Sequence, residues 1–263
     1  MTVNVKTNNI GKSLAEIGNV SNPNLLINPD FKINQRGQTS YDFSTKSGYT
    51  VDRWFISRSK LTINSDNTIT VDFTASGGVI NQPLETTLNE QHTASINITK
   101  ITGSIRFYIG TSKFITITSP GIYTITHDTN ITQVSLYNPT GNNTTASCTI
   151  KWVKLEKGPI ATQFIEPNPT EELNKCVSYY CKYNTIQTFQ GINGQTYRIT
   201  QSFITAMRTN PTCKISVSNL YGTSESNISL LWNNNINYQY TIKAEINANL
   251  TAGINIIADA EIY

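Results

Sequence analysis

Short runs of alternating apolar and polar residues, separated by turn-forming residues, recur along most of the chain and constrain its fold more than any other feature. In residues 68–75, Ile69, Val71 and Phe73 alternate with polar residues, which places all three on one face of a strand. Comparable runs lie at 24–31, 51–57, 92–98, 104–109, 114–118, 121–126, 132–137 and 146–156. Roughly eight or nine strands at a spacing of about 8–12 residues are typical of a β-sandwich or jelly roll.

The composition agrees with an all-β fold. Only 14% of the 263 residues are charged, against about 25% in an average soluble domain. Thr and Ile, which favour strands, and Asn, which favours turns, are abundant instead. This composition argues against a helical bundle, a coiled coil or an α/β enzyme.

One helix is expected to interrupt the strands. Thr170 can cap its N-terminus, and Leu173, Val177 and Cys181 recur at helical spacing, so the helix should end near residues 182–184. Beyond it, strand-like runs return at 196–205, 212–217, 228–232, 238–246 and 254–263, with a hairpin turn expected at 191–194. The predicted organisation is a leader at 1–22, a jelly-roll or β-sandwich domain at 23–167, a linking helix at 168–184 and a smaller β-sandwich domain at 185–263.

The charge pattern and the hydropathy argue against two classes of partner. The net charge is +3 and the basic residues are scattered, so we expect no nucleic-acid binding. No apolar run reaches the roughly 18 residues that a membrane-spanning helix needs, so we expect no membrane insertion. Residues 1–20 lack the apolar region of a signal peptide, which predicts synthesis in the cytoplasm without export by the usual route.

No arrangement of residues predicts catalysis, a metal site or a cofactor. His92 and His127 are the two histidines, neither has a second histidine near it in sequence, and no HExxH, GxSxG, GxGxxG or Walker motif occurs. The sequence leaves open whether Ca²⁺ binds the jelly roll, although no acidic DxDxD loop argues for it. In a chain made in the cytoplasm we expect the cysteines to be reduced structural thiols. They are Cys148, Cys176, Cys181 and Cys213, and they contain no CxxC pair.

Aromatic residues are the best candidates for a binding function. The chain holds 13 Tyr and 3 Trp among many amides, and sugar rings pack on aromatic faces while their hydroxyls bind amides and hydroxyls. Trp54 and Trp152 lie within strand patterns and are expected in the core. Trp232 borders a loop of asparagines, and Tyr221 adjoins Gly222 in a polar segment. The predicted glycan- or receptor-binding residues are Tyr221, Trp232, Asn233, Asn235 and Tyr238.

Four segments resemble, in the same order, a family found among bacteriophage and prophage tail-fibre, head-fibre and receptor-binding proteins. They are Asn24–Phe31 with Asn34–Gly37 and Gly48–Trp54; Val153–Phe164; Glu171–Tyr180; and Met207–Thr212 with Ala258–Ile262. They are similar, respectively, to the opening of a jelly-roll domain that looks like a carbohydrate-binding module, to its last strand, to a linking helix and to a closing β domain. Asn34 stands where an aromatic residue is common in that family, so the role of that aromatic does not carry over.

The resemblance implies a fibre or receptor-binding protein of a phage or phage-like particle, located in the virion. It implies a homotrimer whose leader attaches to other tail, baseplate or capsid proteins and whose C-terminal β tip domain meets a bacterial cell-surface glycan. It supplies no catalytic residues, so we expect no enzyme activity. Two alternatives remain open: a structural baseplate, tail or capsid-decorating component without a ligand, and a polysaccharide depolymerase with carboxylates at a subunit interface.

Overall fold

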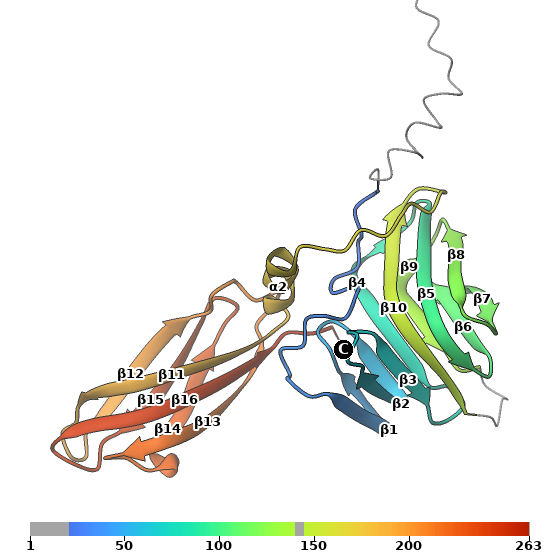
Figure 1. Ribbon diagram of the computed structural model, residues 1–263. Helices are drawn as coiled ribbons and strands as arrows, with labels where there is room; N and C mark the ends of the chain where they lie inside the picture. The colour runs from blue at the N-terminus through green and yellow to red at the C-terminus, as the bar shows by residue number, and fades with distance from the viewer. Residues whose placement is uncertain (1–20, 140–144, 263) are drawn as a thin grey trace, which may run out of the picture. The chain divides into compact units, whose positions relative to one another are not determined.

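The chain is nearly all β and divides into two compact units, Met1–Pro169 and Thr170–Tyr263 (Figure 1). The computed structural model describes residues 21–139 and 145–262. Within these ranges α2 (Pro169–Val177) is the one α-helix, and it lies between the two sets of strands. The predicted fold class is therefore confirmed. The leader predicted at residues 1–22 lies outside the described residues except for Ser21 and Asn22.

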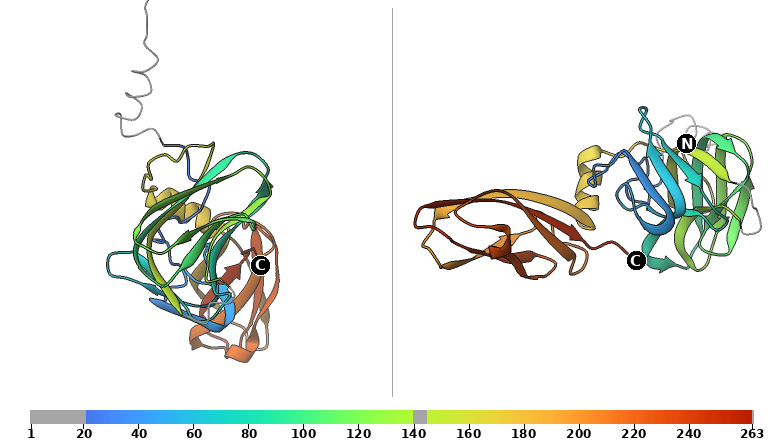
Figure 2. Two further views of the ribbon diagram at one scale, coloured as in Figure 1. Left: turned by 90° about the vertical axis from the view of Figure 1, so that its right-hand side faces the viewer. Right: turned by 90° about the horizontal axis from the view of Figure 1, so that it is seen from below.

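One continuous hydrogen-bonded sheet of ten strands folds over into the two layers of the first unit (Figure 2). Its order is β7-β6-β9-β4-β2-β3-β10-β5-β8, with β1 paired to β2. β2 belongs to both layers, because its residues 55–57 pair with β4 and its residues 59–63 pair with β3. The strands are β1 (Ser40–Tyr49), β2 (Phe55–Ile63), β3 (Ile69–Phe73), β4 (Val79–Leu88), β5 (His92–Thr102), β6 (Ile105–Ile109), β7 (Lys113–Ile117), β8 (Gly121–His127), β9 (Ile131–Tyr137) and β10 (Ala146–Lys157).

The inward face of each layer supplies the core of the first unit. Ile69, Val71 and Phe73 are fully buried, as the alternation of β3 predicts. Trp54 is also fully buried and packs against Phe31, with ring centroids 4.9 Å apart. Trp152, expected in the core as well, is only partly buried, because its ring stacks on Phe164 at the surface, with centroids 4.7 Å apart. The core position is thus confirmed for Trp54 and wrong for Trp152.

Residues 24–31, predicted as a strand, follow an irregular path beside β10. Leu25 N donates to Leu155 O at 2.8 Å, but the segment forms no regular ladder. The strand cannot continue because Pro29 has no N–H to donate and Asn28 adopts a left-handed φ of 55°.

Residues 24–33 and 52–54 meet through buried polar contacts. Asn28 Nδ2 donates to the carbonyl oxygens of Ile33 (2.8 Å) and Asp52 (3.0 Å). Trp54 Nε1 donates to Asn28 O at 2.8 Å. Asn28, Asp52 and Trp54 have no exposed surface, so they hold the N-terminal segment against the sheet and are not available to a ligand.

A buried ion pair on β10 ties two distant segments of the first unit to the sheet. Lys154 Nζ lies 3.2 Å from Glu156 Oε2, and both side chains are at most 2% exposed. Lys154 Nζ donates to Ser21 Oγ and to Thr162 Oγ1, each at 2.6 Å, and Thr162 N donates to Glu156 Oε1 at 2.8 Å. These bonds satisfy charges that would otherwise be costly to bury. We call the set the β10 clamp: Ser21, Lys154, Glu156, Thr162 and Gln163, whose carbonyl oxygen also accepts from Lys154.

The helix is shorter than predicted. It ends at Val177, and residues 180–184, expected to complete it, belong to the next strand, β11 (Tyr180–Gln190). Tyr179 N donates back to Cys176 O at 2.9 Å, which turns the chain out of the helix. The helical spacing of Cys181 was misleading, because β11 pairs with β16 along its whole length.

Two three-stranded antiparallel sheets complete the second unit, with orders β11-β16-β13 and β12-β15-β14. The turn at 191–194 does not close the predicted hairpin. β11 pairs with β16 and β12 pairs with β15, so the turn crosses from one sheet to the other. The remaining elements are β12 (Thr196–Ser202), β13 (Thr212–Tyr221), the 3-10 helix η1 (Glu225–Asn227), β14 (Ile228–Asn233), β15 (Asn237–Lys243) and β16 (Asn249–Asp259).

Candidate functional site

The residues predicted to bind a receptor do not gather into one site. Tyr221 ends β13 in one sheet of the second unit and is 63% exposed. Trp232 lies on β14 in the other sheet and is 43% exposed. Trp232 Nε1 donates to Gln239 Oε1 at 3.2 Å, which holds its ring beside polar side chains. The two exposed rings are therefore separate candidate contacts.

The prediction that Tyr238 contacts a receptor is wrong. Its side chain is 2% exposed and belongs to the core of the second unit together with Tyr240 and Ile242. Tyr238 Oη donates to Gln201 Oε1 at 2.7 Å, and burial raises the pKa of Tyr238 to about 12. The physical reason is the alternation of β15, which turns Tyr238 to the same inward face as Ile242.

Asn233 and Asn235 hold local structure. Asn233 Nδ2 donates to Pro211 O at 2.7 Å, so this amide already has a partner. Asn235 is partly buried, and its carbonyl oxygen accepts from Met207 N at 2.6 Å. Of the five predicted residues, Tyr221 and Trp232 alone are exposed aromatic side chains.

A groove on the first unit brings together the side chains that sugar binding requires, and sequence reasoning missed it. It has a volume of about 450 Å³ and lies on the outer face of the layer formed by β2, β4, β9 and β6. We call it the aromatic groove, and its principal lining residues are Phe55, Asn81, Arg106, Tyr108, Gln133 and Tyr137.

Strand register explains why residues so far apart in sequence meet there. Phe55 lies opposite Asn81, Asn81 lies opposite Ser135, and Ser135 lies opposite Tyr108. Tyr108 in turn lies opposite Phe114 on β7. Residues paired in this way share one face of a sheet, with neighbouring strands about 4.8 Å apart. The row therefore runs across five strands.

The rings in the aromatic groove are held at fixed angles. Tyr108 packs against Phe114, with centroids 4.9 Å apart, and meets Tyr137 edge-on at 6.1 Å. The guanidinium of Arg106 lies 4.4 Å from the Phe114 centroid, a cation–π distance. Such a surface offers ring faces to the C–H groups of a sugar and charged N–H donors to its hydroxyls.

One polar atom in the groove is left without a partner. Asn81 Nδ2 donates to Gln133 Oε1 at 2.8 Å, which fixes both side chains. Asn81 Oδ1 is buried and accepts no hydrogen bond from the described residues. A buried acceptor without a donor is costly, and a ligand hydroxyl that donates to it would recover that free energy.

The alternation of β6 contained a signal for this groove. Ile105, Phe107 and Ile109 are buried, so Arg106 and Tyr108 between them must face outward. An aromatic and an arginine on the polar face of a predicted strand were a reason to consider that face. Sequence alone could not show that β9 and β4 would complete the surface.

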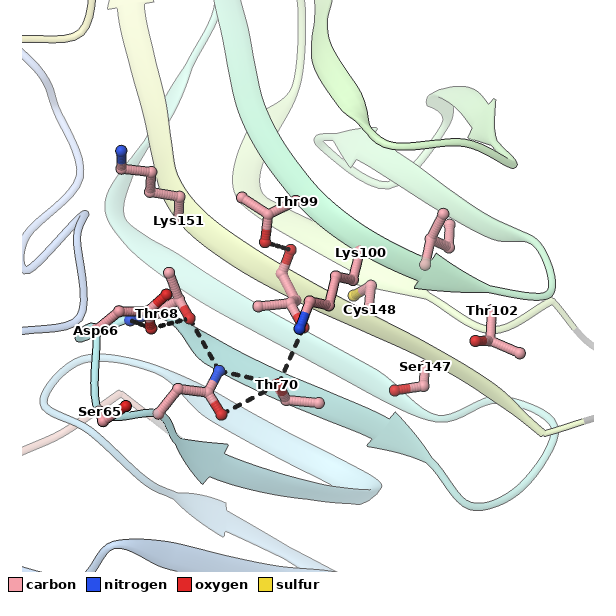
Figure 3. Close-up of a pocket in the computed structure, with 13 residues that line it drawn as sticks. Ser65, Asp66, Thr68, Thr70, Thr99, Lys100, Thr102, Ser147, Cys148 and Lys151 are labelled. Atoms are coloured by element: carbon pink, nitrogen blue, oxygen red, sulfur yellow. Dashed lines mark hydrogen bonds between the residues drawn. The ribbon is translucent and has the colours of Figure 1, made fainter.

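A second groove lies on the outer face of the layer formed by β3, β10 and β5 (Figure 3). Its volume is about 730 Å³, and no aromatic residue lines it. We call it the hydroxyl groove, and it is lined by Asn64, Ser65, Asp66, Thr68, Thr70, Thr99, Lys100, Ile101, Thr102, Ser147, Cys148, Thr149 and Lys151. Cys148 is buried there, and burial raises the pKa of its thiol, so it is not a reactive thiolate.

The histidines and cysteines form no metal site in the described part of the chain. His92 and His127 lie opposite each other on β5 and β8, although the sequence separates them. No group of three or more His, Cys, Asp or Glu side chains that could hold a metal ion occurs within residues 21–139 and 145–262. All four cysteines are free, as predicted. In those same ranges no helix has the length and apolar character needed to cross a bilayer.

No family model matches the chain, and no curated protein matches it significantly. Among solved structures, PfGH50B is similar at 11% identity and a TM-score of 0.31, over 42% of this chain and 23% of its own length. The CBM1 of BiXyn10A in its apo form is similar at 10% identity and a TM-score of 0.32, over 48% of this chain and 100% of its own. Native recombinant discoidin II of Dictyostelium discoideum is similar at 8% identity and a TM-score of 0.23, over 72% of this chain and 79% of its own. At such low scores these likenesses carry no argument about function.

Proposed function

We propose that this protein is a receptor-binding or fibre protein of a bacteriophage or phage-like particle, and that it attaches the particle to a bacterial surface glycan. Two kinds of observation support the proposal. The resemblance of four segments, in order, to phage fibre proteins supports the particle. The chemistry of the aromatic groove supports the glycan.

The observation that carries glycan binding is the pair of Tyr108 and Tyr137 rings beside the fixed Asn81–Gln133 amide pair, in which Asn81 Oδ1 is buried and accepts no hydrogen bond from the described residues. A sugar needs both an apolar surface for its ring and fixed polar partners for its hydroxyls. The Asn81–Gln133 bond orients that polar group before a ligand arrives, which lowers the entropic cost of binding. The proposed contact site therefore lies on the first unit, with Trp232 and Tyr221 on the second unit as competing candidates.

Multivalency would make a weak sugar site effective. Identical sites linked in one particle raise the effective concentration of the second and third contacts. We expect a homotrimer, as the family resemblance implies. Light scattering on the full chain should give three times the 29.2 kDa mass of one chain, and a monomeric mass would contradict this part of the proposal.

The experiment that tests the proposal measures binding of the labelled full chain to a panel of bacterial strains, before and after periodate oxidation of surface sugars. Binding to at least one strain should be lost after oxidation. Tyr108→Ala should weaken that binding about tenfold, since it removes a ring and its packing. Tyr108→Phe, which keeps the ring, should bind within about twofold of the unmodified chain.

Matched variants on the second unit decide between the competing sites. Tyr221→Ala and Trp232→Ala remove exposed aromatic rings of the second unit and should leave binding unchanged. If Trp232→Ala abolishes binding while Tyr108→Ala does not, the site lies on the second unit. Binding that survives periodate would exclude an oxidisable glycan. A correctly folded oligomer that binds no strain would support a purely structural role in the particle.

A further inference from the structure

The hydroxyl groove has no aromatic side chain on which a sugar ring could stack, so it would recognise a ligand through other groups than the aromatic groove does. We propose that it is a second binding site, for a polymer that bears both hydroxyl and anionic groups, such as an acidic glycan. This goes beyond the proposed function, because the site would work whether or not the aromatic groove binds a neutral sugar.

The floor of the hydroxyl groove is a row of small hydroxyl side chains. Thr70 lies opposite Thr149, and Thr149 lies opposite Lys100. In the neighbouring row Ser147 lies opposite Thr102. No ring is available for sugar stacking, so recognition here must depend on hydrogen bonds and charge.

These hydroxyls are already oriented by one another. Asn64 Nδ2 donates to Thr68 Oγ1 at 2.9 Å and to Thr70 Oγ1 at 3.0 Å. Thr70 Oγ1 lies 3.0 Å from Thr149 Oγ1, which continues the network onto the next strand. A network fixed in advance loses little conformational entropy when a ligand binds.

Two lysines supply positive charge without forming an ion pair in the described part of the chain, although the charge of Lys100 helps to lower the pKa of Asp66. Neither Lys100 nor Lys151 has a carboxylate within ion-pair distance among the described residues, whereas Lys60, outside the groove, pairs with Asp42 at 2.8 Å. The register of β10 with β5 shifts on both sides of Ile150, which leaves Lys151 unopposed. β-Bulges of this kind re-aim side chains. In Figure 3, Lys151 lies on the same side of the picture as Asp66 and Thr68, and Lys100 lies nearer the middle.

Two carboxylates limit where an anion can sit: Asp66, and Asp72 at the edge of the groove, where it accepts from Ser147 Oγ at 2.6 Å. Asp66 accepts from Thr68 Oγ1 at 2.6 Å, and this bond holds the pKa of the Asp66 carboxyl below its ordinary value. Asp66 is therefore ionised and repels an anion from the β3 side of the groove. A chain laid across the strands would place its hydroxyls on the β3 side, near Asp66, and its anionic groups on the β10 and β5 side, at the two lysines.

The test uses the full chain and three immobilised probes: polygalacturonate, which carries carboxylates, poly(glycerol phosphate), which carries phosphodiesters, and neutral dextran. The unmodified chain should bind at least one of the two anionic polymers and bind dextran at least about tenfold more weakly. The probe that binds better identifies the source of the anion.

Two double variants with the same change in net charge test whether the anionic polymer binds at the hydroxyl groove. Lys100→Glu with Lys151→Glu should weaken binding of the anionic polymer by about tenfold or more, whereas Lys46→Glu with Lys243→Glu, at exposed lysines elsewhere, should change it by about twofold or less. Lys100→Gln with Lys151→Gln, which removes charge without reversing it, should give an intermediate loss. All variants should keep the thermal unfolding midpoint of the unmodified chain.

Three results would overturn the proposal. They are no binding of either anionic polymer, equal losses in the two double reversals, and equal binding of dextran. Tyr108→Ala separates this site from the aromatic groove, because it should leave binding of the anionic polymer unchanged. If Tyr108→Ala abolished binding of both kinds of polymer, the two grooves would not be independent.

Discussion

The two outer faces of the first unit arise from the same alternating strands, yet they carry opposite chemistry. The aromatic groove has rings, amides and an arginine, whereas the hydroxyl groove has threonines, serines and two lysines. Both faces cover one shared core, since β2 pairs with strands of both layers. The difference shows that alternation fixes which side chains point outward but leaves their chemistry free to diverge.

The largest expected effect comes from a core substitution that destabilises both layers and so disrupts both grooves. Phe73 is fully buried between the layers, and Phe73→Ala should lower the free energy of unfolding of the first unit by about 3–5 kcal/mol. Denaturant unfolding of the full chain measures it, with Phe114→Ala at the surface as the control, which should cost far less. If Phe73→Ala left one groove able to bind while the other was lost, the two layers would not depend on one core.

Raising the salt concentration should weaken binding at the hydroxyl groove more than binding at the aromatic groove. Raising NaCl from roughly 50 to 500 mM shortens the screening length several-fold. Binding of an anionic polymer at Lys100 and Lys151 should then fall by about tenfold, and periodate-sensitive cell binding at the aromatic groove by about twofold or less. Surface plasmon resonance and cell binding at both salt concentrations measure this. Equal losses at both faces would mean that charge dominates at each.

Substitution of one amide side chain, Asn81, should affect binding at the aromatic groove alone. Asn81→Leu keeps the approximate volume of the side chain but removes the unpaired acceptor and the bond to Gln133, and should weaken periodate-sensitive cell binding about fivefold. Binding of the anionic polymer should not change. An Asn81→Leu variant that binds cells normally would show that the rings alone carry recognition.

The smallest expected effect lies in the hydroxyl network. Thr149→Val removes the Oγ1 that bridges to Thr70 and keeps the shape of the side chain. Binding of the anionic polymer should weaken about twofold to threefold, with a change in unfolding free energy of about 1 kcal/mol or less. Titration calorimetry and thermal unfolding distinguish the two quantities. A loss as large as that of the lysine variants would assign recognition to the hydroxyls.

Patterns of neighbouring residues predicted most of the strands, because the alternation that decides which side chains are buried is a local property of the sequence. The inward residues of β3 alternate in sequence and are buried as expected. The predictions failed where distant pairing decides. Residues 180–184 have helical spacing, but pairing with β16 draws them into a strand. The turn at 191–194 has hairpin chemistry, yet its flanking strands pair elsewhere.

The candidate sites were harder to predict for the same reason. Phe55, Asn81, Tyr108 and Tyr137 come from four strands whose order, β2-β4-β9-β6, does not follow the sequence. No motif marks them, and no local spacing brings them together. Tyr238 failed as a candidate because composition favours aromatics at binding surfaces, while alternation within β15 assigns this one to the core.

The β10 clamp has a mechanical consequence. Ser21 and Thr162 are 141 residues apart in sequence, yet both bind the same ammonium group of Lys154. A pull on the chain before Ser21 and after Gln163 would first load the hydrogen bonds that join these segments, namely the direct bond from Ser21 Oγ to Gln163 O (2.6 Å) and those from Lys154. The strands between the two segments would carry none of that tension while the clamp held. A chain pulled at these two points would thus bear force without distorting the aromatic groove or the hydroxyl groove.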